Sequence, residues 1–152
     1  MIFHSKRRTT SNTIQKKKHF TQMSIKEKQT CIKLLQDTVK KYKQLTVSEH
    51  TEEKLETNIN FKALIGMIFG TNNLQYIIEY NQTTKYGRVE RRILVRHPQK
   101  VKVDGYLSYM YIVIGVDTGR IVTAYYNKVT DVHKTLDLNY YDKNLKIYWH
   151  YI

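Results

Sequence analysis

The chain has 152 residues, enough for one core of ordinary size, and it carries 26 Lys and Arg against 13 Asp and Glu. The net charge of +13 predicts attraction to polyanions, either nucleic acid or an anionic membrane surface. The single cysteine excludes an internal disulfide, and no apolar run approaches the ~18 residues that a membrane span needs. We therefore expect a cytoplasmic protein without a membrane segment.

Residues 1–22 are expected to form a disordered basic arm, because they are rich in Ser, Thr and Lys and show no apolar period. Lysine clusters give sequence-independent affinity for phosphate without needing structure. The candidate nucleic-acid-binding residues of this arm are Lys6, Arg7, Arg8, Lys16, Lys17 and Lys18. A solubilising tail explains the same composition, and this alternative stays open.

Ser24 and Glu27 have the spacing of a capping box and predict the start of a helix. Apolar residues recur behind them at helical spacing and predict one face packed on a core. The other face presents lysines, of which Lys33, Lys40 and Lys41 are further candidates for nucleic-acid binding.

Two more helices are expected before residue 70. Thr46 and Glu49 form a second potential capping box, which predicts a helix to about Asn58. Asn60 is placed to cap a short apolar helix, FKALIGMIFG, that ends at Gly70.

From residue 74 the apolar period changes to two, which is typical of strands. We expect strands at 74–80, 88–96, 106–116 and 121–127, with a last one in the tail NLKIYWHYI. In the second strand, alternation sends Ile93 and Val95 to an apolar face together with Arg91, and Arg92 and Arg96 to a cationic face. Pro98 is expected to end this strand, because proline cannot donate to a strand ladder.

The predicted fold class is therefore α+β. N-terminal helices, at about 24–69, pack on one face of a mainly antiparallel, four- to five-stranded twisted sheet, at about 74–152. Residues 23–152 form a single domain, and the disordered basic arm precedes it.

Most enzyme classes with recognisable motifs find no support here. The chain has no HExxH, CxxC or phosphate-binding glycine loop, so we expect no metal and no cofactor. Metal-independent RNA cleavage needs none of these motifs, because the ribose 2′-hydroxyl attacks the phosphorus and the protein supplies a general base, a general acid and cations. The candidate catalytic residues are His50, Arg92, Arg96, Thr123, Tyr125 and His133. Each also has an ordinary structural explanation, since strand arginines are often solvated and Thr and Tyr favour strands.

Three stretches, VSEHTEEKL, ERRILVRHP and YIVIGVDTGRIVTAYYN, resemble the barnase, EndoU, colicin and RelE superfamily of small toxin nucleases, particularly phage-type members. The resemblance covers about residues 46–141. It implies an α+β fold, RNA as substrate and no metal, with function carried by His50, by Arg92 or Arg96, and by Thr123 and Tyr125. The chain departs from the pattern in lacking a basic residue late in the helix that follows His50.

The sequence thus leads to three readings. The first is an RNA-directed protein, a metal-independent endoribonuclease of toxin type. The alternative is a noncatalytic basic protein from a phage or mobile element that binds nucleic acid or blocks a host complex. The third is an interaction domain or homodimer built on Tyr109, Tyr111 and Tyr126. The expected partners are RNA or another nucleic acid, and an antidote or a host nucleoprotein; the sequence leaves the oligomeric state open.

Overall fold

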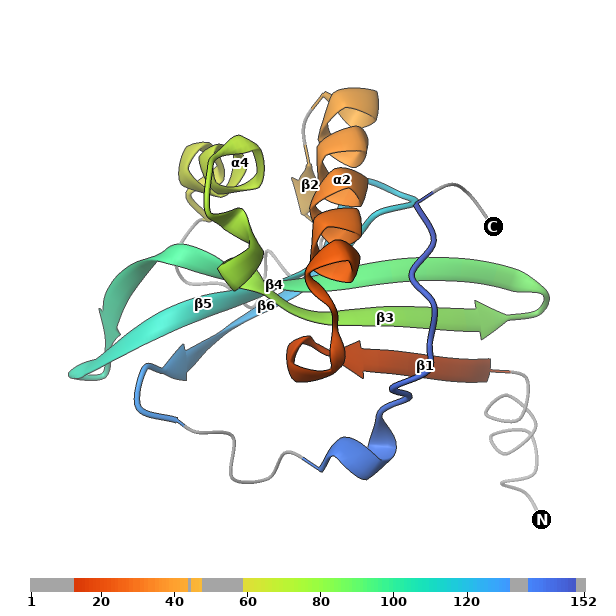
Figure 1. Ribbon diagram of the computed structural model, residues 1–152. Coiled ribbons are helices and arrows are strands. Elements are labelled where there is room, and N and C mark those ends of the chain that lie inside the picture. Colours follow the sequence, from red (N-terminus) through yellow and green to blue (C-terminus); the bar gives the residue numbers. More distant parts are fainter. Residues whose placement is uncertain (1–12, 44, 48–58, 132–136, 150–152) are drawn as a thin grey trace, which may run out of the picture.

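A computed structural model describes residues 13–43, 45–47, 59–131 and 137–149. The predicted α+β class is confirmed, and Figure 1 shows the helices on the same side of a strongly twisted sheet. The helices are α2 (Ile25–Tyr42) and α4 (Phe61–Phe69). The strands are β1 (Thr13–His19), β2 (Thr46–Val47), β3 (Ile77–Lys85), β4 (Arg88–Val103), β5 (Tyr106–Gly115) and β6 (Arg120–Lys128). Short 3-10 turns cover Phe20–Gln22, Asn73–Tyr76 and Leu138–Tyr140.

Within the described residues the sheet has six strands, in the order β1-β3-β4-β5-β6-β2. The prediction of four to five strands is therefore wrong. All neighbouring pairs are antiparallel except β2 with β6, which is parallel and makes the sheet mixed. Both additional strands come from the N-terminal part of the chain, before the region where the sequence alternates.

The prediction of a disordered arm up to residue 22 is wrong for its second half. Residues 13–19 form β1, which pairs with β3 over its whole length. Tertiary contacts stabilise this lysine-rich strand: the Lys18 ammonium is buried and donates to Glu27 Oε2 at 2.6 Å and to the Leu145 carbonyl at 3.1 Å. A buried ammonium with two such acceptors is tolerated, whereas an unpaired one is not. Residues 1–12 lie outside the described part.

The predicted caps at the starts of α2 and α4 are both confirmed. The Glu27 amide donates to Ser24 Oγ at 3.1 Å and the Ser24 amide to Glu27 Oε1 at 3.0 Å, so each side chain satisfies a backbone donor. Asn60 Oδ1 accepts from the Ala63 amide at the start of α4. The prediction of a helix at 46–58 is wrong at its start, because Thr46–Val47 form β2. Residues 48–58 lie outside the described part.

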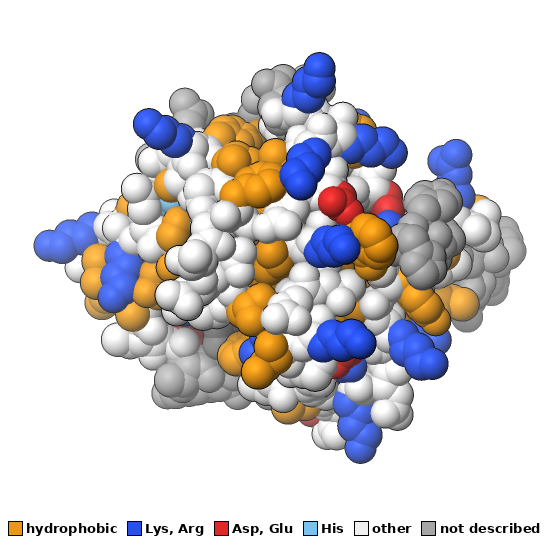
Figure 2. All heavy atoms as spheres, turned by 45° about the horizontal axis from the view of Figure 1, so that its top comes forward, with side chains coloured by type: hydrophobic (Ala, Val, Ile, Leu, Met, Phe, Trp, Pro, Cys, Tyr) orange, Lys and Arg blue, Asp and Glu red, His pale blue; other side chains and the backbone are white. Residues whose placement is uncertain are grey.

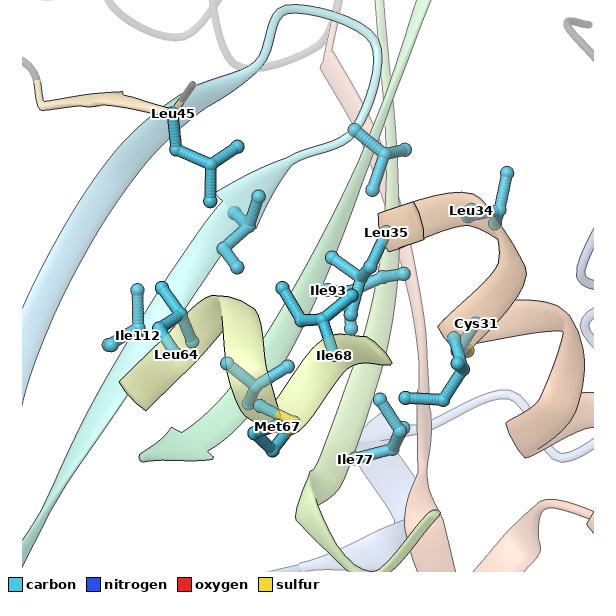
Figure 3. Packing of buried hydrophobic residues seen from close by; sticks show 14 of the residues in the cluster. Cys31, Leu34, Leu35, Leu45, Leu64, Met67, Ile68, Ile77, Ile93 and Ile112 are labelled. Carbon is cyan, nitrogen blue, oxygen red and sulfur yellow. The ribbon is translucent and has the colours of Figure 1, made fainter. Parts of the chain in front are cut away.

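The core lies between the two helices and one face of the sheet. Leu35 from α2 and Leu64 and Ile68 from α4 meet Ile93 of β4 and Ile112 of β5, and all five are at most 1% exposed (Figure 3). We call this the inner face of the sheet and the opposite one the outer face.

Arg91 shares the inner face with the apolar residues of β4, as alternation predicts. Its guanidinium contacts Asp117 at 2.6 Å, and the side chains of the two residues are only 5% and 13% exposed. The Arg91 guanidinium also donates to the Tyr148 carbonyl, and the Tyr42 hydroxyl of α2 donates to the Asp117 carbonyl. This buried pair joins β4, the β5–β6 turn, α2 and the C-terminal segment.

Three strand boundaries differ from the predictions. Residues 73–76 are a 3-10 turn, and β3 continues to Lys85. β4 runs past Pro98 because the pairing of β4 with β5 is interrupted between Arg96 and Lys100. Proline has no amide hydrogen to donate, and it is tolerated at such an irregularity. Residues 144–149 form no strand and instead cross beside β1 and α2 (Figure 1).

Candidate functional site

Four of the predicted catalytic residues lie on the outer face. Ile93 and Val95 of β4 are fully buried on the inner face, so Arg92 and Arg96 face the other way. Directly opposite residues in an antiparallel pair share a face, and the register β4–β5–β6 aligns Arg96 with Tyr111 and Tyr125. The same register aligns Leu94 with Val113 and Thr123. His50 and His133 lie outside the described residues.

Arg96 is held by aromatic rings. Its guanidinium carbon lies 4.4 Å from the centre of the Tyr109 ring and 5.5 Å from that of Tyr76. Its Nε atom is buried and has no hydrogen-bond partner among the described residues. Aromatic rings attract a cation without neutralising it, so Arg96 offers a fixed positive charge to an incoming anion.

Tyr111 and Tyr125 stack beside Arg96, with ring centres 5.6 Å apart and ring planes 12° from parallel. Tyr125 forms the surface side of this stack, since the residue is 44% exposed. Partial burial raises the pKa of both hydroxyls, which therefore remain protonated at neutral pH. The two rings form a platform with a neutral phenol at its edge.

Arg92 lies nearer the β3–β4 turn and pairs with Glu90 at 3.2 Å. Both side chains are about one-third exposed, at 32% and 36%. An ion pair of this exposure contributes about 0–1 kcal/mol. It is therefore weak enough for Arg92 to exchange Glu90 for a phosphate.

Glu79 is a site residue that the sequence did not reveal. A register shift at Ile78 turns the chain between Ile77, which is buried on the inner face, and Glu79, which lies opposite Leu94 on the outer face. Arg92 and Arg96 are then its diagonal neighbours on β4, a relation that places residues about 7–8 Å apart. No alternation pattern indicates such a shift.

Tyr141 reaches Glu79 from the C-terminal segment and donates its hydroxyl to Glu79 Oε1 at 2.6 Å. Burial and this hydrogen bond raise the pKa of Tyr141, which keeps it a donor. The His19 ring lies edge-on to Tyr141 at 5.6 Å. The negative charge of Glu79 also helps to raise the Tyr125 pKa, after burial, so the carboxylate and the tyrosine platform act on one another.

The C-terminal segment passes round the β1 edge from the outer to the inner face (Figure 1). The Asp142 amide donates to the Lys17 carbonyl at 2.8 Å, and Leu145 is buried in the core. Trp149 Nε1 then donates to Asp37 of α2 at 2.6 Å, and the Lys33 ammonium lies 3.7 Å from the centre of its ring.

The predicted nucleic-acid-binding lysines occupy different positions. Lys16 is exposed on the inner side of β1, Lys17 is half-buried on the outer face, and Lys18 is buried in its ion pair. Lys40 and Lys41 of α2 are exposed and lie over the rings of Phe69 and Tyr42, as Lys33 lies over Trp149. Lys6, Arg7 and Arg8 are outside the described residues. Figure 2 shows lysine and arginine side chains spread over the helix side of the molecule with few acidic ones.

Other kinds of site receive no support from the described residues. Within 13–43, 45–47, 59–131 and 137–149, no three His, Cys, Asp or Glu side chains gather where they would hold a metal ion. No helix in these ranges is both long and apolar enough to cross a bilayer. A hollow of about 650 Å³ at the β4–β5 turn is lined by residues such as Asp104, Tyr106 and Lys128, and by none of the predicted catalytic residues.

The chain matches no protein-family model, no curated protein and no solved structure.

Proposed function

We propose that the outer face binds RNA and that the protein is a metal-independent endoribonuclease of toxin type. One observation carries the proposal: a cation held by aromatic rings, Arg96, shares this face with the carboxylate of Glu79 and the neutral phenols of Tyr125 and Tyr141. These are the kinds of group that a phosphoryl transfer without a metal requires.

The reaction assigns a role to each kind of group. A base takes the proton from the ribose 2′-hydroxyl, the 2′-oxygen attacks phosphorus, and the 5′-oxygen leaves with a proton from an acid. The products are a 2′,3′-cyclic phosphate and a 5′-hydroxyl. Arg96 and Arg92 stabilise the charge that gathers on the phosphorane, and Glu79 is the base candidate among the described residues. His50, which the family resemblance implies, is the remaining candidate for proton transfer.

The test is cleavage of a long RNA in EDTA, followed by analysis of the ends. Arg96→Gln should lower the rate at least 100-fold, because one preorganised charge contributes about that factor to transition-state stabilisation. Arg88→Gln, on the same strand and close to the β3–β4 turn, is the matched control and should retain the parent rate. Intact RNA after long incubation at high protein concentration would remove the nuclease proposal.

A second candidate is a noncatalytic nucleic-acid-binding protein that occupies RNA or blocks a host nucleoprotein complex. The spread of lysines over the helix side favours it, since that charge lies away from the outer face (Figure 2). Tight, strongly salt-dependent RNA binding without any cleavage would select this candidate.

A further inference from the structure

The outer face carries a second row of side chains besides the one that contains Arg96. The paired registers of five neighbouring strands place Lys17, Asn81, Arg92, Gly115 and Arg120 directly opposite one another. We call this line of residues the cationic row. It runs across the strands from β1 at one edge to β6 and holds three positive charges on one face.

The spacing of the cationic row follows from sheet geometry. Neighbouring strands lie about 4.8 Å apart, so Lys17, Arg92 and Arg120 are separated by about 10 Å each. Between Arg92 and Arg120 stands Gly115, and the Thr118 hydroxyl and the Glu90 carboxylate, the partner of Arg92, fill the space that a side chain would take there. Between Lys17 and Arg92 stands Asn81, a neutral hydrogen-bonding side chain.

The row of Arg96, Tyr111 and Tyr125, which we call the aromatic row, runs parallel to the cationic row. Arg96 lies four residue steps beyond Arg92 along β4, which corresponds to about 13 Å. A third row lies between them and includes Glu79, Leu94 and Thr123. The cationic row thus holds three of the four cations named on this face, and the aromatic row holds the fourth, Arg96, beside its tyrosine rings.

Resting on the proposed RNA binding, we infer that the ligand is a single strand of RNA that lies across the β-strands, with its sugar–phosphate backbone along the cationic row and its bases toward the aromatic row. The stacking surface of Tyr125 serves only a base whose face is uncovered, as in single strands; in a duplex each base face is covered by its neighbours. The three separated cations match successive contacts to one backbone.

β1 thereby becomes part of the binding surface. Lys17 extends the cationic row to the edge of the sheet, where its ammonium also lies 4.6 Å from the centre of the Tyr141 ring. Lys16 and Lys18, its neighbours in sequence, lie on the inner side of the sheet, and Lys18 is engaged by Glu27. Of the three consecutive lysines, Lys17 alone belongs to the cationic row.

The test uses the full chain and a fluorescent 2′-O-methyl RNA, which has no free 2′-hydroxyl and so separates binding from cleavage. Affinity is measured by anisotropy over a range of salt concentrations, because each phosphate contact in a single strand contributes about 0.7 to the slope of log affinity against log salt. The triple variant Lys17→Gln, Arg92→Gln, Arg120→Gln should lower that slope by about 2. Lys17→Gln alone should lower it by about 0.7, whereas Lys16→Gln, with the same change of charge on the opposite face of β1, should leave it unchanged.

Two further variants separate the rows. Glu90→Gln removes the anion that pairs with Arg92 and should strengthen binding severalfold, because Arg92 no longer exchanges partners. Tyr125→Leu should weaken binding about tenfold without changing the salt slope, since stacking contributes about 1–3 kcal/mol per base and releases no counterions. The duplex of the same oligonucleotide should bind the parent protein at least tenfold more weakly than the single strand.

The outcomes distinguish this inference from the proposed function. A parent protein that binds no oligonucleotide and cleaves no RNA removes the proposed function itself. A parent that binds while the triple variant keeps its salt slope, or that prefers the duplex, overturns the cationic row and leaves RNA binding in place. Circular dichroism of the variants, whose changed side chains are at least partly exposed, reports that their fold is retained.

Discussion

Arg91 and Arg92 are consecutive in sequence and lie on opposite faces of β4, so a matched pair of substitutions separates folding from function. Arg91→Gln removes the guanidinium that contacts Asp117 and the Tyr148 carbonyl on the inner face. Arg92→Gln removes a cation that pairs with Glu90, and both of these side chains are about one-third exposed.

The structure gives the magnitudes. The side chain of Asp117 is only 13% exposed, and Arg91→Gln removes the cation that compensates this burial. Removing one partner of a buried ion pair lowers the free energy of unfolding by about 3–5 kcal/mol. Losing an exposed ion pair lowers it by about 0–1 kcal/mol. We therefore expect Arg91→Gln to lower the free energy of unfolding by several times as much as Arg92→Gln.

The assay is urea unfolding followed by the fluorescence of Trp149, the single tryptophan, which is tethered to Asp37 of α2 in the folded chain. Arg92→Gln should keep the parent midpoint and weaken RNA binding; Arg91→Gln should shift the midpoint strongly. Equal midpoints for both variants would refute the assignment of the two arginines to buried and exposed faces. An Arg91→Gln, Asp117→Asn double variant should recover part of the loss, because no charge is then left buried without a partner.

Three further predictions concern burial and backbone conformation. Burial raises the pKa of the Cys31 thiol to about 12, so the folded protein should not react with a thiol reagent at pH 8, and reaction at the rate of a free cysteine would contradict its place in the core. Burial raises the pKa of the Tyr80 and Tyr141 hydroxyls above the ordinary 10.0, and the hydrogen bond to Glu79 also raises the pKa of Tyr141. Above pH 10 the folded state therefore binds more protons than the unfolded state. Stability from these groups is complete below pH 10 and should fall as the pH rises further, as measured by urea midpoints; a constant midpoint from pH 9 to 11 would argue against it. Gly119→Ala should cost about 2 kcal/mol or more in thermal or urea unfolding, because Gly119 has φ of 68° and a Cβ would lie 2.5 Å from the Tyr42 ring; an unchanged midpoint would contradict this packing.

Local signals in the sequence were sufficient for the parts of the fold that depend on local chemistry. The capping box at Ser24 and Glu27 and the cap at Asn60 set the starts of α2 and α4. Alternation in β4 correctly separated buried Arg91 from Arg92, since side-chain direction follows strand periodicity without further information.

The missed features depend on contacts distant in sequence. β1 has no apolar alternation, and its burial requires Glu27 and Leu145 to receive the Lys18 ammonium. Glu79 reaches the outer face through a one-residue register shift, and its partner Tyr141 comes 62 residues later. Neither contact leaves a pattern in the sequence, so sequence periodicity alone could not place Glu79 and Tyr141 in the candidate site.

We propose that the outer face of this sheet cleaves RNA with the chain's own groups. The most direct measurement is the identity of the ends formed when the purified protein is incubated with RNA in EDTA. We expect 2′,3′-cyclic phosphate and 5′-hydroxyl ends, whose formation Arg96→Gln abolishes and Arg88→Gln does not. Cleavage that Arg96→Gln leaves intact, or that yields 5′-phosphate ends, would contradict it.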